Sequence, residues 1–151
     1  MLQLTKNKQY VSEKFVRTGI IKQRIEDCRY AAVDLYETSV QESEFVDCKF
    51  SSVNWRNSKF KKVTFTNCIF DKVDMSGCEF ISCAFLDCEW EEISLDRSII
   101  GQKKLDLTGT KFEVVAGVEA LAGHTLSYQQ AIALLPGLLK EKEIRLDAET
   151  V

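Results

Sequence analysis

The sequence has little proline, little glycine and one histidine, and each shortage excludes a class of structure or chemistry. Its 151 residues contain one proline and seven glycines, which argues against long disordered linkers. The single histidine, His124, has no serine or cysteine constellation at a recognisable spacing, so we expect a surface or capping role for it rather than catalysis. No apolar run approaches the roughly 20 residues of a membrane span. Residues 1–8 lack the apolar core of a signal peptide, so we expect a cytoplasmic protein without membrane contact.

The chain also lacks an excess of basic residues. It carries 20 Lys and Arg against 23 Asp and Glu, a net charge of −3. Direct binding of nucleic acid is therefore not expected, because such proteins carry a clear surplus of Lys and Arg. Hydrophobic residues make up 45% of the chain, enough for the core of one ordinary domain.

Apolar residues recur at every fifth position. All twenty residues at multiples of five from Tyr10 to Leu105 are apolar or aromatic, which has a chance probability on the order of 10⁻⁷ at this composition. Residues two positions earlier are mostly small or β-branched and include all six cysteines. This order of inward and outward residues fits neither a helix nor a continuous strand. It predicts three residues of extended chain followed by a two-residue corner.

Similar residues return after twenty positions, which predicts four five-residue units per coil. Stacked coils must lie about 4.8 Å apart for their backbones to hydrogen-bond, so residues 10–105 should form nearly five coils and a rod about 24 Å long. The side chains expected to form columns inside this all-β solenoid are Phe45, Phe65, Phe85, Phe50, Phe70, Trp90, Cys28, Cys48, Cys68 and Cys88.

The five-residue units resemble pentapeptide repeats. Segments such as Val-Asp-Met-Ser-Gly (residues 73–77) and Val-Asn-Trp-Arg-Asn (residues 53–57) follow the family pattern of a small residue, Asp or Asn, a large apolar residue and two free positions. The resemblance implies a right-handed quadrilateral β-helix, here of about five coils with a C-terminal helical cap.

The register of the repeat changes near residues 101–104. Leu107 and Phe112 then take the central positions, a shift of two residues that a bulge or short loop can absorb. We expect the β-helix to occupy residues 1–114 and a cap with a helical segment to occupy residues 115–151. Ser127 and Gln130 have the spacing of a capping box, and Pro136 predicts a break in the helix.

The C-terminal segment has more apolar residues than a cap needs. A stack of coils needs a cap at its end, and the surplus predicts a partner surface, for which a twofold homodimer is the simplest solution. The resemblance points the same way, because quinolone-resistance members of the family join two rods through a C-terminal helical segment. The candidate interface residues are Ile132, Leu134, Leu135, Leu138 and Leu139.

Catalytic, metal-binding and cofactor-binding motifs are not found. The cysteines share their slot with Val, Thr, Ser and Ile, so space filling explains them better than a disulfide or zinc. The sequence has no glycine-rich phosphate loop and no paired-carboxylate motif. We therefore expect a protein that is not an enzyme and has no cofactor or metal.

Because no catalytic or cofactor site is expected, we expect the outer surface of the rod to carry the function. One candidate partner-binding wall is acidic and consists of Glu26, Asp27, Glu44, Asp47 and Asp87. A second acidic cluster comprises Glu89, Glu91, Glu92 and Asp96. Our first hypothesis is an interaction rod or scaffold with an unknown protein partner.

The alternative hypothesis follows from the resemblance to gyrase-binding family members. It is a DNA mimic that binds DNA gyrase or topoisomerase IV and protects it from quinolones. Residues 10–112 contain 17 acidic and 15 basic residues, a net charge of −2. Duplex DNA of 24 Å would carry roughly fourteen negative charges, so the whole rod is not a charge mimic. This comparison places the scaffold hypothesis first.

Overall fold

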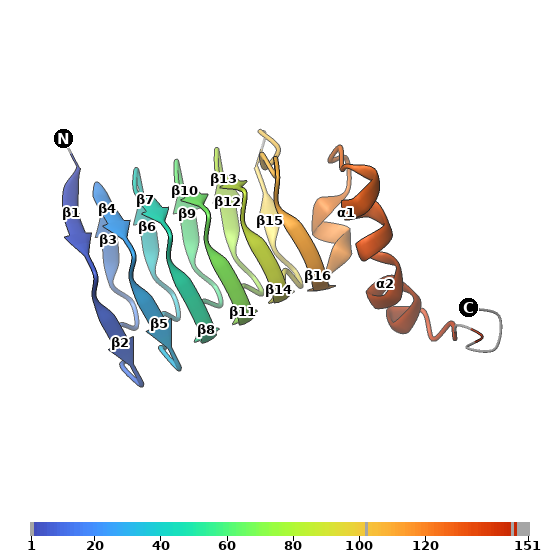
Figure 1. Ribbon diagram of the computed structural model, residues 1–151, viewed down its shortest axis with the longest axis horizontal. Coiled ribbons are helices and arrows are strands. Elements are labelled where there is room, and N and C mark those ends of the chain that lie inside the picture. Colours follow the sequence, from blue (N-terminus) through green and yellow to red (C-terminus); the bar gives the residue numbers. More distant parts are fainter. Residues whose placement is uncertain (1, 102, 146, 148–151) are drawn as a thin grey trace.

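The chain folds into a stack of four-sided coils closed at one end by helices (Figure 1). The computed structural model describes residues 2–101, 103–145 and 147. Three walls of the stack are parallel sheets, and the fourth is made of turns with isolated bridges such as that between Asp34 and Asn54. The predicted β-solenoid with a C-terminal helical cap is confirmed.

Each sheet contains strands from successive coils, in chain order along the stack, and the last coil contributes a strand to sheet B alone. Sheet A consists of β1 (Gln3–Lys6), β4 (Gln23–Glu26), β7 (Glu44–Val46), β10 (Thr64–Thr66) and β13 (Ala84–Leu86). Sheet B consists of β2 (Gln9–Val11), β5 (Arg29–Ala31), β8 (Lys49–Asn54), β11 (Ile69–Asp74), β14 (Glu89–Ser94) and β16 (Lys111–Ala116). Sheet C consists of β3 (Gly19–Ile21), β6 (Ser39–Gln41), β9 (Lys59–Lys61), β12 (Glu79–Ile81) and β15 (Ile99–Ile100).

Residues twenty positions apart lie over one another. In sheet A, Phe45 pairs with Phe65 and Phe65 with Phe85. Their rings stack with centroids 4.9 and 4.8 Å apart, close to the spacing of paired strands. The expected twenty-residue register is therefore confirmed. The stack is longer than the five coils counted from residues 10–105, because β1 and β16 add strands at its two ends.

The corners explain how such short strands can turn. The second residue after most central ones has a left-handed backbone, with φ of 51° at Asp27, 57° at Asn57 and 68° at Gly77. This conformation is open to glycine and tolerated by Asn and Asp, but it costs other residues about 1–2 kcal/mol. The sequence nevertheless places Ala32 and Lys72 at such corners. The stacked pairing on either side must hold these residues in place.

The register shift lies between β15 and β16. Glu79 pairs with Ile99, twenty residues later, whereas Glu89 pairs with Lys111, twenty-two residues later. The two additional residues thus enter the chain between Ile100 and Lys111, in the region expected from the sequence.

The cap begins after β16 with a 3₁₀ turn, η1 (Val118–Leu121), followed by α1 (Tyr128–Ala133) and α2 (Leu135–Glu141). Ser127 and Gln130 form the predicted capping box at the start of α1. The expected break at Pro136 lies instead at Leu134, because proline is accommodated in the first turn of α2. No helix in the described part of the chain is long and apolar enough to cross a membrane.

Candidate functional site

The predicted acidic wall is largely neutralised in sheet A. Arg24 forms ion pairs with both Glu26 and Glu44. The ammonium of Lys6 also lies 3.8 Å from the Glu26 carboxylate. Such exposed pairs add little stability, but they cancel the charge that a partner would encounter. Glu26 and Glu44 therefore do not present a free acidic surface.

The other three residues of that wall lie on the corner between sheets A and B. Asp27, Asp47 and Asp87 share this column with Asn67, whose side-chain amide donates to Asp47 Oδ1 at 2.7 Å. A shallow groove there is also lined by Arg29, Lys49 and Glu89. The five predicted residues are thus divided between two columns, and basic side chains accompany both.

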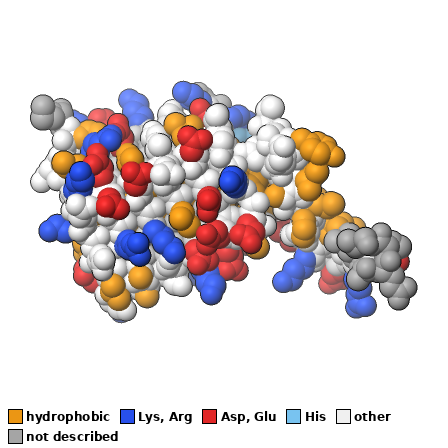
Figure 2. Space-filling model, in the orientation of Figure 1, with side chains coloured by type: hydrophobic (Ala, Val, Ile, Leu, Met, Phe, Trp, Pro, Cys, Tyr) orange, Lys and Arg blue, Asp and Glu red, His pale blue; other side chains and the backbone are white. Residues whose placement is uncertain are grey.

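A different acidic surface lies on the C-terminal strands of sheet B. We call it the acidic face and define it as Asp71, Glu89, Glu91, Glu92 and Glu113. None of the five is within 4 Å of a Lys or Arg nitrogen in the residues that the structure describes. Figure 2 shows acidic side chains gathered over this part of the stack.

The acidic face overlaps only partly with the second cluster expected from the sequence. Glu89, Glu91 and Glu92 belong to it through β14. Asp96 lies beyond β14, on the fourth wall, where Arg97 is 3.9 Å away. Glu113 joins because Trp90 pairs with Phe112 and Glu92 with Val114, which places Glu113 opposite Glu91. The two-residue shift was the signal that could have identified this neighbour.

All ten residues predicted for the core columns are buried. In sheet B the rings of Tyr30, Phe50 and Phe70 stack with centroids 5.1 and 5.0 Å apart. The inside of the rod is therefore filled by its own side chains. The charged residues, which differ from coil to coil, face outward.

The six cysteines are free and buried. Five of the six thiols donate to backbone carbonyls of the preceding coil, as Cys68 Sγ does to Phe45 O at 3.4 Å and Cys88 Sγ to Phe65 O at 3.3 Å. Burial raises the pKa of Cys78 to about 12 because it disfavours the thiolate. In the described part of the chain, no three His, Cys, Asp or Glu side chains are grouped to hold a metal ion.

The predicted dimer residues separate into two groups. Leu134 is buried and packs with the core of its own chain. Ile132, Leu135 and Leu138 remain exposed, with 51%, 46% and 39% of their surface accessible. Leu139 is half-buried. Apolar side chains cover the outside of the helical segment in Figure 2. Only part of the predicted set is thus available to a partner.

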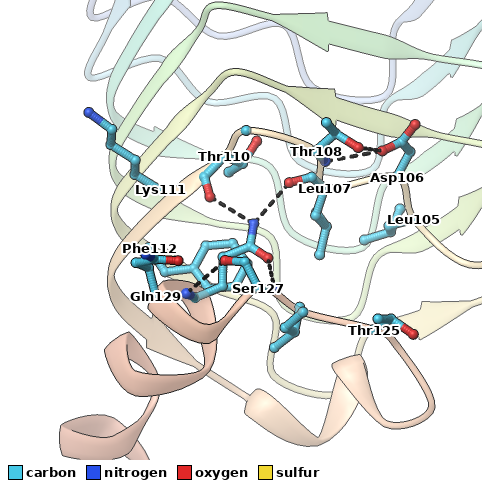
Figure 3. A pocket seen from close by; sticks show the side chains of 13 residues that line it. Leu105, Asp106, Leu107, Thr108, Thr110, Lys111, Phe112, Thr125, Ser127 and Gln129 are labelled. Carbon is cyan, nitrogen blue, oxygen red and sulfur yellow. Dashed lines mark hydrogen bonds between the residues drawn. The ribbon is translucent and has the colours of Figure 1, made fainter.

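Polar side chains hydrogen-bond the cap to the last coil. Gln130 donates its side-chain amide to the carbonyls of Leu107 and Thr110, at 2.9 and 2.8 Å. Leu107 and Thr110 line a groove between α1 and the coil, where Figure 3 labels both. His124 Nε2 accepts a hydrogen bond from the Leu105 amide at 3.0 Å, and its Nδ1 donates to the Leu121 carbonyl at 3.1 Å. His124 therefore has a capping role in the structure.

Comparisons with known proteins agree with this repeat geometry. Residues 43–86 match the family model for pentapeptide repeats, in eight copies. No curated protein matches the chain.

Solved structures of pentapeptide-repeat proteins are also similar. One is Rfr23 from the cyanobacterium Cyanothece 51142, with 7% identity over 72% of this chain and 90% of that one, at a TM-score of 0.37. Another is a trypsin-treated variant of QnrB1, a plasmid-mediated fluoroquinolone resistance protein. It has 12% identity over 97% of this chain and 98% of that one, at a TM-score of 0.41.

Proposed function

This chain is a pentapeptide-repeat protein, and on that premise we propose that it is a non-catalytic rod that binds a protein partner through its acidic face. The observation that supports the proposal is the set of five carboxylates on β11, β14 and β16 that have no ion-pair partner in the described residues. Charges left unpaired on a rigid wall can steer and orient a partner of opposite sign.

The charge density of this face is high only locally. Three neighbouring strands span two steps of about 4.8 Å, so about 10 Å of the rod carries five carboxylates. Lys72 and Lys111 on the same strands reduce the net charge to −3, from five acidic and two basic residues. Duplex DNA of that length carries roughly six negative charges. The face therefore has about half the charge of duplex DNA, and a basic protein surface is the partner that fits it.

Charge reversal on the face tests this proposal. Glu91→Lys with Glu92→Lys is the test variant, and Glu13→Lys with Glu42→Lys is the control, because it makes the same charge change on exposed residues outside the face. We expect proteins captured from host extract by the wild-type rod to be lost with the test variant and kept with the control. Equal capture by all three baits would refute the role of the acidic face.

The second candidate function is binding to DNA gyrase or topoisomerase IV at the site that DNA occupies. The acidic face is the observation that favours it, although that face has about half the charge of duplex DNA, and the net charge of −2 over residues 10–112 argues against it. A supercoiling assay with purified gyrase, with and without a fluoroquinolone, separates the two. Inhibition or protection that disappears in the Glu91→Lys, Glu92→Lys variant would support this candidate. A lack of effect with the rod in excess would discard it.

We further propose that two rods associate through the exposed apolar residues of the helical segment. The interface would contain Ile132, Leu135 and Leu138, which are exposed. Leu134 is excluded because it is buried in the core of its own chain. Light scattering should give the mass of a dimer for the wild type and of a monomer for Ile132→Glu with Leu135→Glu. A monomeric wild-type protein at micromolar concentration would contradict the dimer.

A further inference from the structure

The end of the stack formed by the first coil is open. The helices lie at the opposite end in Figure 1, and among the described residues β1, β2 and β3 each pair with a strand on one side only. In the second coil, the Arg29 amide donates to the Lys8 carbonyl, and the Glu26 carbonyl accepts from Asn7. The equivalent groups one coil earlier, the Gln9 amide and the Lys6 carbonyl, face no further coil within the described residues. Unpaired strand edges of this kind are templates for an added strand.

The open end also exposes part of the apolar core. Tyr10, Phe15 and Ile20 are only half-buried, whereas the corresponding residues of the middle coils are completely buried. Together with second-coil residues such as Ile25, they line a hollow of about 270 Å³. Val11, which follows Tyr10 in β2, is 62% exposed. The hollow is large enough to receive one or two apolar side chains.

The charge of this end is opposite to that of the rest of the chain. The first coil, residues 3–22, contains five basic residues and one acidic residue, a net charge of +4, although the whole chain has a net charge of −3. Lys6 and Arg17 form ion pairs with second-coil glutamates. Lys8, Lys14 and Lys22 are exposed and have no ion pair in the described part of the chain.

From these three features we propose that the open end binds an acidic, extended segment of a partner protein. The segment adds a strand along β1 and β2, as in other cases of strand addition. Its alternate apolar side chains enter the hollow over Tyr10 and Phe15. Its carboxylates meet the first-coil lysines Lys8, Lys14 and Lys22, which are exposed. The surface is separate from the acidic face and does not depend on its function.

A second copy of the chain fits this end less well. Two first coils stacked end to end would bring their unpaired lysines together, and like charges oppose association. Lys8 also stands in the inward column that Cys28 and Cys48 occupy in later coils, so a second coil would bury a charged residue. A lipid surface would satisfy the lysines but would leave the strand-edge amides and carbonyls without hydrogen bonds.

A labelled peptide tests the site directly. The probe is an eight-residue fluorescein-labelled peptide that alternates Val and Glu, and its control replaces each Glu with Lys. We expect fluorescence anisotropy to show saturable binding of the Val-Glu peptide alone. Hydrogen exchange of the complex should show new protection at residues 3–11.

Substitutions of the first-coil lysines separate charge recognition from loss of folding. Lys14→Gln with Lys22→Gln should weaken peptide binding by about tenfold, because two unpaired charges are removed. The matched control, Lys61→Gln with Lys62→Gln, should bind like the wild type, and both variants should unfold at the wild-type temperature.

Four results would overturn the proposal. The first is a lack of binding of the Val-Glu peptide, and the second is hydrogen-exchange protection outside residues 3–11. The third is an equal loss of peptide binding in both double variants, and the fourth is an end-to-end dimer that Lys14→Gln strengthens. Binding to phosphatidylserine vesicles without binding to the peptide would likewise overturn it and assign the end to a lipid. None of these results affects the capture test for the acidic face, so the two proposals fail separately.

Discussion

Trp90 stacks on Phe112, with ring centroids 4.8 Å apart and planes inclined by 14°, although 22 residues separate them rather than 20. In the coils below, the same column joins Phe50 and Phe70 across 20 residues. The aromatic column therefore continues through the register shift, and Lys103 and Lys104, in the segment where the shift occurs, are exposed. The packing of large rings, rather than the count of residues, sets the register at this end of the stack.

The two tryptophans offer a matched test of an unpaired buried group. Both are completely buried, but Trp55 Nε1 donates to Thr38 Oγ1 at 3.0 Å, whereas Trp90 Nε1 has no hydrogen-bond partner among the described residues. Trp90→Phe removes an unsatisfied donor, and Trp55→Phe breaks a bond and leaves an oxygen behind. We expect Trp90→Phe to lower the free energy of unfolding by about 1 kcal/mol less than Trp55→Phe does. Equal losses in urea unfolding would contradict this assignment.

Truncating a side chain in the middle of the sheet A column should lower the free energy of unfolding more than truncation elsewhere. Phe65 is completely buried and stacks on Phe45 and Phe85. Phe65→Ala should lower the free energy of unfolding by about 3–5 kcal/mol, because it leaves a cavity between two fixed rings. Lys61→Ala, on the exposed side of β9, should change it by less than about 0.5 kcal/mol. Thermal and urea unfolding followed by circular dichroism measure both values.

His124 should make the stability of the cap depend on pH. Burial lowers the pKa of His124 below its usual 6.5, because burial disfavours the charged ring, and nearby Lys104 acts in the same direction. Its Nε2 must also stay unprotonated to accept from Leu105. The unfolded chain therefore takes up the proton first, so the stabilisation is present above about pH 6.5 and is lost as the pH falls toward the folded pKa.

The His124→Gln variant isolates this contribution. Subtracting its unfolding free energy from that of the wild type, pH by pH, removes the effect of the carboxylates. The difference should decrease between pH 7 and pH 5. A constant difference over that range would show that His124 does not titrate with folding.

The cysteines should react slowly with thiol reagents in the folded protein. Cys28 and Cys68 are 0% and 1% exposed, and burial raises the pKa of both thiols. Because the thiolate is the reactive species, labelling should proceed only as fast as the coils open. Ellman's reagent should therefore count six thiols in urea and few at early times in buffer. Rapid reaction of the native protein would favour a thiol-based sensor.

The period of the sequence predicts most of the fold, because each class of residue has one place in a coil. A central residue such as Phe65 must point inward, and the next one of its column must stand twenty positions away. The shift at residues 101–104 is also visible, since Phe112 no longer falls on a multiple of five. These are one-dimensional features, so a single sequence contains them.

The functional surface is harder to predict because it depends on pairs of side chains in neighbouring coils. Glu26 and Glu44 look free in the sequence, yet Arg24 reaches both of them. Glu113 lies 22 positions from Glu91 and joins it only through the shifted pairing. Likewise, nothing in the apolar run of the tail distinguishes buried Leu134 from exposed Leu135. Such contacts follow from side-chain reach and helix docking, which the repeat pattern does not specify.

We expect a protein partner to contact the acidic face rather than any other wall of the rod. The most direct measurement is photo-crosslinking in the host cell, with benzoylphenylalanine placed in turn at Glu91 in β14 and at Lys61 in β9, on a different wall. We expect a cross-linked adduct of one defined mass from position 91 and none from position 61. Adducts of equal yield from both positions, or from position 61 alone, would contradict it.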